Sequence, residues 1–254
     1  MHSLFRSRDR ETRAAPEPDP TVFPVITGAE VAAVFVGQRV AGDFYDAIRV
    51  SPERVLIGLL DVAGLNQENR AVLSAAQEIF RTLGTQLFSG SDINESEAMI
   101  DLNLRINRRL AETSSGVRSC PAFIACYHEK FGTLCYTNDG HTPALLRDSS
   151  GITELDPTGL PLGLFSHATS DARIVGLEKA AALLLVSHGV VSCESGRNGS
   201  SGQYGLDRVK QLLQQATISN AQSLCASVLN SVAEFTGHAP ACDDRTALAL
   251  VRTS

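Results

Sequence analysis

The chain has 254 residues, of which 43% are apolar and 20% charged, an ordinary composition for a globular protein large enough to bury a sizeable core. Its 28 acidic and 22 basic side chains give a formal net charge of −6. Because this balance lacks the positive surface that binding to a phosphate backbone requires, we expect no nucleic acid among the partners.

The first 20 residues do not have the pattern of a targeting segment. They contain four Arg, which four acidic side chains match, and they lack an apolar stretch. We therefore expect a disordered tail over residues 1–20 and one domain over residues 21–254. No later run approaches the roughly 18 apolar residues that a membrane span needs, so the sequence predicts a cytoplasmic protein without membrane contact.

The first part of this domain is predicted to be β-structure. Val31–Val36 is apolar and rich in β-branched residues, which favours a buried strand, and Gly42-Asp43 interrupts the pattern. Val55–Asp61 is a second apolar run, and it ends abruptly on a carboxylate. Ser51–Arg54 has the composition of a hairpin turn before this second strand.

The pattern then changes to helical periodicity. Apolar residues recur at three- and four-residue spacing over Gln67–Leu87 and again over Glu95–Leu110, which predicts two amphipathic helices. Short apolar runs between turn signals predict the remaining strands. We expect these strands at Ala122–Tyr127, Thr133–Asn138, Ala144–Arg147, Ala182–Ser187 and Thr246–Arg252, and two more helices at Leu206–Gln215 and Ala221–Phe235.

The order of these elements limits the fold class. Blocks of strands alternate with pairs of helices, whereas a parallel sheet needs a regular alternation of one strand and one helix. The order therefore favours an α+β fold in which mostly antiparallel sheet is covered by helices. The pattern alone goes no further.

Three carboxylates occupy similar local contexts. Asp43 follows Gly42, Asp61 ends an apolar strand, and Asp243 precedes the last strand. If they converge at one edge of a sheet they repel one another, and a hard divalent cation such as Mg²⁺ or Mn²⁺ would resolve that repulsion. The alternative is that they are solvated turn residues, because Asp is common at such positions.

Short segments around these carboxylates resemble a known family, the SpoIIE/RsbU-type phosphatases of the metal-dependent, type 2C-like protein phosphatase class. Val40–Asp46 (VAGDFYD) resembles the family's GGDFYD, and Leu60–Gly64 (LDVAG) resembles the start of its GDVSGHG. Five further segments follow in the expected order and extend the resemblance over nearly the whole chain. They are Asn138–Leu146 (NAGHNPPLL in the family), Thr158–Gly163 (GLPLG), Leu183–Val190 (LLLYTDGV), Tyr204–Val209 (FGxERL) and Asp243–Thr246 (DDxT).

The resemblance implies a four-layer αββα sandwich of two mainly antiparallel sheets with helices outside. It also implies two divalent cations, Mn²⁺ or Mg²⁺, that activate a water for attack on a phosphoserine or phosphothreonine. Carried over by position, Asp61 bridges the cations and the Val62 carbonyl is a further ligand. Asp43 helps to hold one cation and Asp243 the other, so Asp43 and Asp61 are also the expected catalytic residues. Asp244 is then a turn residue or a supporting group behind the ligands.

Two departures from the family pattern bear on activity. The Asp of the family's TDGV is replaced by His188, which removes an oxygen ligand. The segment Leu60–Asn66 lacks the Ser and His of the family's GDVSGHG. The imidazole of His188 could itself bind a transition metal such as Mn²⁺, or it could be a neutral histidine with no metal bound.

The resemblance therefore leads to two hypotheses for the function. The first is a Mn²⁺- or Mg²⁺-dependent serine/threonine protein phosphatase, with a small regulatory phosphoprotein such as an anti-sigma-factor antagonist as substrate and partner. The alternative is a pseudophosphatase that keeps the fold and binds a partner protein without hydrolysis. The three carboxylates favour the enzyme, and His188 with the altered segment 64–66 favours the alternative.

One further motif has the residue types of a catalytic Asp-Gly-His sequence. Asp139-Gly140-His141 lies between two predicted strands, where Asp-Gly is first of all a turn signal. The resemblance also places this string away from the metal ligands. We therefore interpret it as a turn without a catalytic role.

Overall fold

The computed structural model describes residues 20–37, 42–62, 67–113, 119–195 and 202–254. The tail expected over residues 1–20 lies, except for its last residue, outside this part of the chain and stays a prediction. The altered segment 64–66 also lies outside the described residues. None of the helices in the described part is long and apolar enough to cross a membrane.

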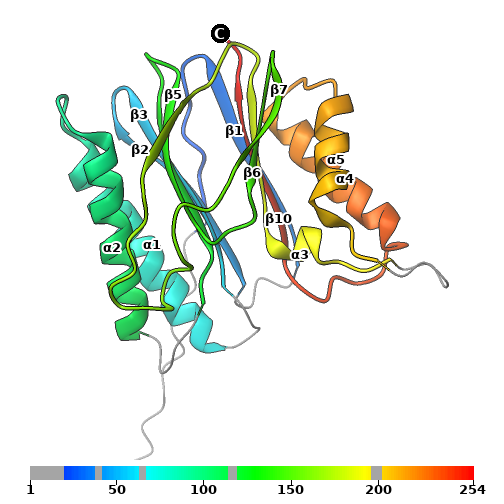
Figure 1. The fold of residues 1–254 in the computed structure, drawn as a ribbon, viewed down its shortest axis with the longest axis horizontal. Coiled ribbons are helices and arrows are strands. Elements are labelled where there is room, and N and C mark those ends of the chain that lie inside the picture. The colour runs from blue at the N-terminus through cyan, green and yellow to red at the C-terminus, as the bar shows by residue number, and fades with distance from the viewer. Residues whose placement is uncertain (1–19, 38–41, 63–66, 114–118, 196–201) are drawn as a thin grey trace, which may run out of the picture.

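Two five-stranded antiparallel sheets lie face to face between two pairs of helices (Figure 1). The first sheet has the order β1 (Ala29–Val36), β10 (Arg245–Arg252), β9 (Ala182–Val186), β6 (Ala144–Asp148), β7 (Gly151–Leu155). The second has the order β2 (Asp43–Ser51), β3 (Arg54–Asp61), β4 (Ala122–His128), β5 (Thr133–Asp139), β8 (Arg173–Gly176). The α+β class and the αββα sandwich expected from the sequence are confirmed.

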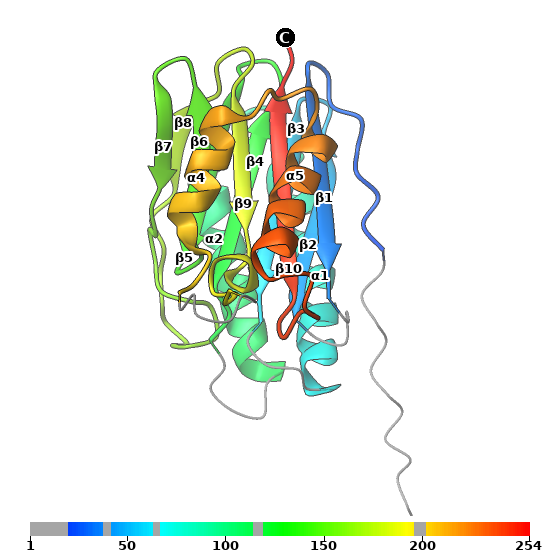
Figure 2. The same cartoon turned by 90° about the vertical axis from the view of Figure 1, so that its right-hand side faces the viewer.

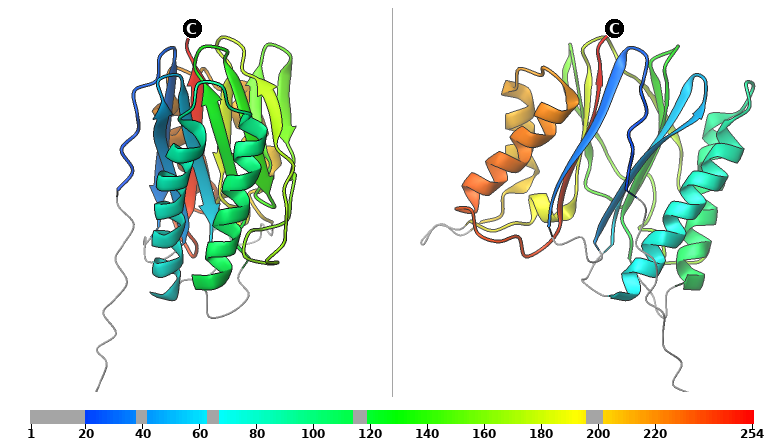
Figure 3. Two further views of the ribbon diagram at one scale, coloured as in Figure 1. Left: turned by 90° about the vertical axis from the view of Figure 1, so that its left-hand side faces the viewer. Right: turned by 180° about the vertical axis from the view of Figure 1, so that it is seen from behind.

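The helices form the outer layers. Figure 2 shows α4 (Gly205–Gln215) and α5 (Ala221–Phe235) over the first sheet. Figure 3 shows α1 (Gln67–Phe88) and α2 (Glu95–Thr113) over the second sheet. A single helical turn, α3 (His188–Val191), directly follows β9.

Three apolar cores hold the four layers together, and the alternation of side chains along each strand builds them. On β3, Ile57 and Leu59 face the opposite sheet and pack in the central core. Leu56 and Leu60 point the other way, into the core beneath α1 and α2. The third core lies between the first sheet and the pair α4 and α5. Because β3 is covered on both faces, it is a continuous apolar run in the sequence.

Four elements were not predicted from the sequence: β2, β7, β8 and α3. β2 carries Asp46 in its middle, which is buried because Arg81 of α1 donates to it through Nε over 2.7 Å. β7 and β8 are edge strands with mostly exposed residues, so they show no apolar alternation. α3 is one turn long, which is too short for a periodic pattern. Strands and helices are predicted from the periodic spacing of buried apolar residues, and these four elements lack that spacing.

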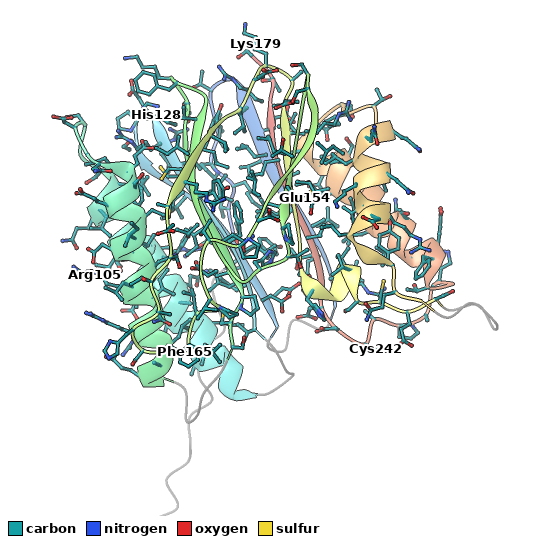
Figure 4. All side chains as sticks on the ribbon, viewed as in Figure 1. Arg105, His128, Glu154, Phe165, Lys179 and Cys242 are labelled. Atoms are coloured by element: carbon teal, nitrogen blue, oxygen red, sulfur yellow. The ribbon has the colours of Figure 1, made fainter. Side chains whose placement is uncertain are left out.

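The strand β3 runs the length of the sandwich and defines its two ends. Arg54 begins β3 and lies opposite His128 of β4, at what we call the distal end. Asp61 ends β3, at what we call the site end. Figure 4 labels His128 and Lys179 at the distal end, and Phe165 and Cys242 at the site end.

Candidate metal site

Strand alternation brings four polar side chains to one place between the sheets at the site end. Asp43 and Asp61 are direct partners in the register of β2 and β3, and both occupy positions that face the opposite sheet. Thr246 of β10 lies at an inward position of the first sheet, and Ser187 follows the inward-facing Leu185 of β9. Acidic side chains from one sheet therefore meet hydroxyl groups from the other.

The Asp43 carboxylate is buried among neutral donors and like charges. Thr246 Oγ1 donates to its Oδ2 over 2.6 Å, and Ser187 also hydrogen-bonds to the carboxylate. Burial raises the pKa of Asp43 well above its ordinary value, and the charge of Asp61 raises it further. The two hydroxyl donors lower the pKa, and Asp244 adds a smaller upward effect. The net direction is upward, so ionised Asp43 is held here at an electrostatic cost.

Asp61 joins the two sheets at the site. Its Oδ2 accepts a hydrogen bond of 2.7 Å from the backbone N–H of His188, the first residue of α3. This donor orients the carboxylate but carries no full charge, so it does not neutralise the negative charges of Asp61 and Asp43. The closely paired acids therefore keep their mutual repulsion.

A pocket of about 220 Å³ opens beside Asp61. The side chains of His188 and Asp243 are exposed here, and Asp243 Oδ1 accepts the backbone N–H of Asp244 over 2.9 Å. The side chain of Val62 packs in the core beneath α1 and α2, so only its backbone is available to the site. The residues that line the pocket are Asp61, Ser119, Pro121, Gly140, Thr142, His188 and Asp243.

Asp244 lies behind the pocket, in a space that Gly37, Gly42 and Gly189 leave open. A Cβ at Gly42 would come within 2.2 Å of the Asp244 carboxylate, and a Cβ at Gly189 within 2.0 Å of the Asp244 carbonyl oxygen. A larger residue at Gly189 would push the backbone before β10 away from the site, and a larger residue at Gly42 would displace the Asp244 carboxylate. Asp244 is only 2% exposed, so of the two adjacent acids it is Asp243 that faces the pocket.

Sequence reasoning missed one wall of the pocket. It placed Asp139-Gly140-His141 away from the metal ligands, and this is wrong, because Gly140 and Thr142 line the same pocket as Asp61. The error arose because a turn signal gives no information about which end of the sheet a turn occupies. The place of Asn138–Leu146 among the family's ordered motifs is a signal for this wall, although the resemblance was interpreted above as setting the string apart from the metal ligands.

The imidazole of His141 is buried behind this wall. Its Nδ1 lies 2.9 Å from the Thr142 carbonyl, which can only accept, so Nδ1 carries the proton of the neutral ring. Within the described part of the chain, its buried Nε2 has no hydrogen-bond partner. Burial lowers the pKa of His141, so the ring is a neutral group next to the acidic pocket.

Only some of the side chains at the site are suited to bind a hard divalent cation. Asp43 and Asp61 offer carboxylate oxygens, the donors that Mg²⁺ and Mn²⁺ prefer, and their repulsion favours cation binding. Among the described residues, however, no group of three or more His, Cys, Asp or Glu side chains is arranged to hold a metal ion. The Asp43–Asp61 pair is therefore the part of this site that fits a metal.

The fold and the order of these segments agree with comparisons to known proteins. The family model of stage II sporulation protein E (SpoIIE) matches residues 51–253. The chain belongs to the SpoIIE family. Its two antiparallel sheets and outer helices are the fold of the metal-dependent, type 2C-like serine/threonine phosphatases.

Individual relatives are distant. The SpoIIE-family chain is 25% identical to protein IcfG of Synechocystis sp. over 202 residues. This alignment covers 69% of this chain and 31% of IcfG. It is 24% identical to the phosphoserine phosphatase RsbP of Bacillus subtilis over 154 residues. This alignment covers 60% of this chain and 37% of RsbP. The chain thus spans about a third of the length of these relatives.

A solved structure shares the fold over most of the chain. The RsbU and RsbW domains of Rv1364c from Mycobacterium tuberculosis superpose with a TM-score of 0.72 at 24% identity. The match covers 91% of this chain and 62% of that structure.

Proposed function

We propose that this chain is a metal-dependent phosphatase that hydrolyses phosphoserine or phosphothreonine on a small regulatory phosphoprotein, such as an anti-sigma-factor antagonist. The observation that carries the proposal is the Asp43–Asp61 pair, two adjacent carboxylates on the inner face beside an open pocket. A structural role alone would not account for placing two repelling acids together, since their repulsion costs stability. The family to which the chain belongs and the likeness to RsbP support the same reaction class.

In this proposal Asp61 and Asp43 hold Mn²⁺ or Mg²⁺, with Asp243 and the Val62 carbonyl as further ligands. When bound, the cations would supply a Lewis acid that neutralises phosphoryl charge and activates water. The ligand set rests on the resemblance to the family and on the position of Asp61 and Asp243 at one pocket.

The chain's own groups preorganise this site. The hydroxyl groups of Thr246 and Ser187 fix the Asp43 carboxylate, and the His188 backbone N–H fixes Asp61. Because these donors come from the opposite sheet, the sandwich itself sets the distance between the acids and the pocket. The pocket, at about 220 Å³, is smaller than the roughly 300–1,000 Å³ that encloses a drug-sized ligand, so it suits a phosphorylated side chain.

The second candidate function is a pseudophosphatase that binds a partner without hydrolysis. Two observations favour it: an exposed imidazole stands at His188, and no three-ligand metal group occurs among the described side chains. Under this hypothesis the pocket binds a partner's side chain, and the paired acids are a remnant of the enzyme site.

The His188→Asp variant decides between these candidates. We expect wild type to hydrolyse a small phosphate ester weakly, with Mn²⁺ better than Mg²⁺, since one carboxylate ligand of the family is missing. Adding that carboxylate should raise turnover, most strongly with Mg²⁺. Turnover would be measured for wild type, His188→Asp and the inactive control Asp61→Asn across concentrations of both metals. Silence in both wild type and His188→Asp would favour the pseudophosphatase.

A further inference from the structure

The segment between β7 and β8, residues 156–172, crosses from the first sheet to the second, and we call it the rim segment. It starts beside the end of β5, where the Asn138 carbonyl accepts the backbone N–H of Thr158 over 2.7 Å. Its Pro161 packs directly on Gly140, where an added Cβ would come within 2.5 Å of the proline ring. Because Gly140 lines the pocket, the rim segment supports this wall of the pocket.

Asp139, the last residue of β5, binds both the rim segment and α2 through its carboxylate. Ser170 of the rim segment donates to its Oδ1, and Asn103 of α2 donates to its Oδ2 over 2.7 Å. An added Cβ at Gly159 would come within 2.8 Å of Oδ1, so the rim segment lies directly against the carboxylate. Because Gly140 is the next residue in the chain, these contacts act on the pocket wall at its first residue.

The family motif does not provide this attachment. NAGHNPPLL has Ala where this chain has Asp139, and the Ala side chain cannot accept a hydrogen bond. Burial raises the pKa of Asp139 from 3.8 to about 6, so near neutral pH a buried charge stands among neutral donors at a cost in stability. Hydrogen bonds to an ionised acceptor are, however, about twice as strong as those to a neutral one. The acid thus lowers the stability of the whole protein and strengthens one local attachment.

The rim segment has a second attachment to α2, which does not depend on Asp139. The Oδ1 atom of Asn107 accepts the backbone N–H of Gly163 over 2.7 Å, and its Nδ2 donates to the carbonyl of Phe165 over 2.9 Å. A change at Asp139 should therefore leave the rim segment in place and loosen chiefly the end of β5, which leads into the pocket wall.

We propose that Asp139 is a positioning residue that holds the pocket wall formed by Gly140 and Thr142 in place for the phosphorylated side chain. The inference rests on the proposed function, because it assigns the pocket to that side chain. Both wall residues line the same pocket as Asp61, so a phosphate group bound next to Asp61 meets this wall. Asp139 is fully buried and acts through Gly140, so it should affect substrate affinity and leave the chemical step unaltered.

Two variants weaken the attachment but change global stability in opposite directions. Ser170→Ala removes a donor from the buried carboxylate and should lower the free energy of unfolding at pH 7. Asp139→Asn removes the buried charge and should raise it. Both variants should raise KM for p-nitrophenyl phosphate with Mn²⁺, because both weaken the attachment of the wall.

The expected sizes follow from the hydrogen bonds that change. Ser170→Ala loses a bond to an ionised acceptor and should raise KM about tenfold. The neutral bonds in Asp139→Asn are about half as strong, so KM should rise about threefold. In both variants kcat should stay within about twofold of wild type, since no group at the reacting atoms has changed.

The matched control is Asp148→Asn. Asp148 also accepts a serine hydroxyl, from Ser150 over 2.6 Å, but it lies in the turn between β6 and β7. This variant makes the same chemical change to an aspartate bonded by a serine, and its KM should equal that of wild type.

Hydrogen exchange of backbone amides gives a second readout, which needs neither metal nor activity. The N–H of His141 belongs to the wall and donates to Asn138 Oδ1 over 2.8 Å. It should exchange faster in Ser170→Ala and in Asp139→Asn than in wild type. The N–H of Gly163 is held by Asn107 and should exchange as in wild type.

The outcomes separate this inference from the proposed function. A KM that follows stability, rising in Ser170→Ala and falling in Asp139→Asn, would show a merely structural role and overturn the inference. So would a KM unchanged in both variants. If wild type has no turnover, the proposed function fails and the exchange of the His141 N–H decides alone. Faster exchange in both variants would then support the positioning of the wall, and unchanged exchange in either would overturn it.

Discussion

The charged residues at the two ends of β3 have neighbours of opposite kinds: a partner of opposite charge at one end and a residue of like charge at the other. At the distal end Arg54 is buried, but its Nε donates to Glu95 over 2.6 Å and its Nη1 to the Gly90 carbonyl over 2.8 Å. At the site end Asp61 lies against Asp43, an acid of the same sign. One end of the same strand has its charge paired, and the other has like charges brought together.

The difference separates the end with a structural ion pair from the end where we propose the chemistry takes place. A buried ion pair with additional hydrogen bonds holds α2 and its preceding loop onto the sheet, and breaking it leaves a charge without a partner. A pair of like charges stabilises nothing in the free protein, so its presence indicates a role for a bound cation. Substitutions at the two ends should therefore separate activity from stability.

The largest effect is expected for Asp61→Asn at the site end. Removal of the acid should abolish metal-dependent activity, a loss of at least about a thousandfold. Stability of the metal-free protein should change little, because an amide oxygen still accepts the His188 N–H and the repulsion with Asp43 disappears. Calorimetric Mn²⁺ titration and urea unfolding of both proteins would measure this. A loss of several kcal/mol without metal would give Asp61 a structural role instead.

The opposite result is expected for Arg54→Ala at the distal end. This change leaves Glu95 without its partner in a mostly buried place, which should lower the free energy of unfolding by about 3 kcal/mol. Metal binding should stay as in wild type. The control Arg105→Ala breaks an exposed pair on α2, and its unfolding midpoint should match wild type. Equal midpoints for the two variants would show that the Arg54–Glu95 pair is not structural.

A smaller effect is expected at Asp139, the buried acid beneath the rim segment. Burial raises its pKa from 3.8 to about 6, although Ser170 and Asn103 donate to it. A folded-state pKa above the unfolded one means that stability falls as pH rises from about 4 to about 6. Asp139→Asn should remove this fall and be more stable above pH ~6, by at most ~3 kcal/mol. Urea unfolding in metal-free buffers from pH 4 to 7 measures it, and a pH-independent difference would contradict the prediction.

The smallest effect is expected at Ala180. The backbone of this residue is strained, so the distal end also contains a strained position. Ala180 has a φ of +62°, in the left-handed region that favours glycine, in the turn before β9. Ala180→Gly should raise the free energy of unfolding by about 0.5 kcal/mol. The same change at Ala226, inside α5, should lower it by about 1 kcal/mol. If both variants lose stability, the strain at Ala180 is negligible.

Much of the fold could be predicted from the sequence because burial leaves a periodic pattern. β3 and β9 are covered on both faces and appear as apolar runs, and α1 and α2 show helical spacing. β2 was missed because its Asp46 is compensated by Arg81, a residue distant in the sequence. A local pattern cannot contain such a partner.

The types and positions of the acidic residues, together with the resemblance to the SpoIIE family, predicted which side chains could bind a metal. Asp43, Asp61, Asp243 and His188 were all named in this way. Only the tertiary structure decided what surrounds them: that Asp43 and Asp61 are register partners, that a backbone N–H from the other sheet meets Asp61, and that Gly140 shares the pocket. The physical reason is that these contacts join segments far apart in the chain, and their distances are set by how two sheets pack.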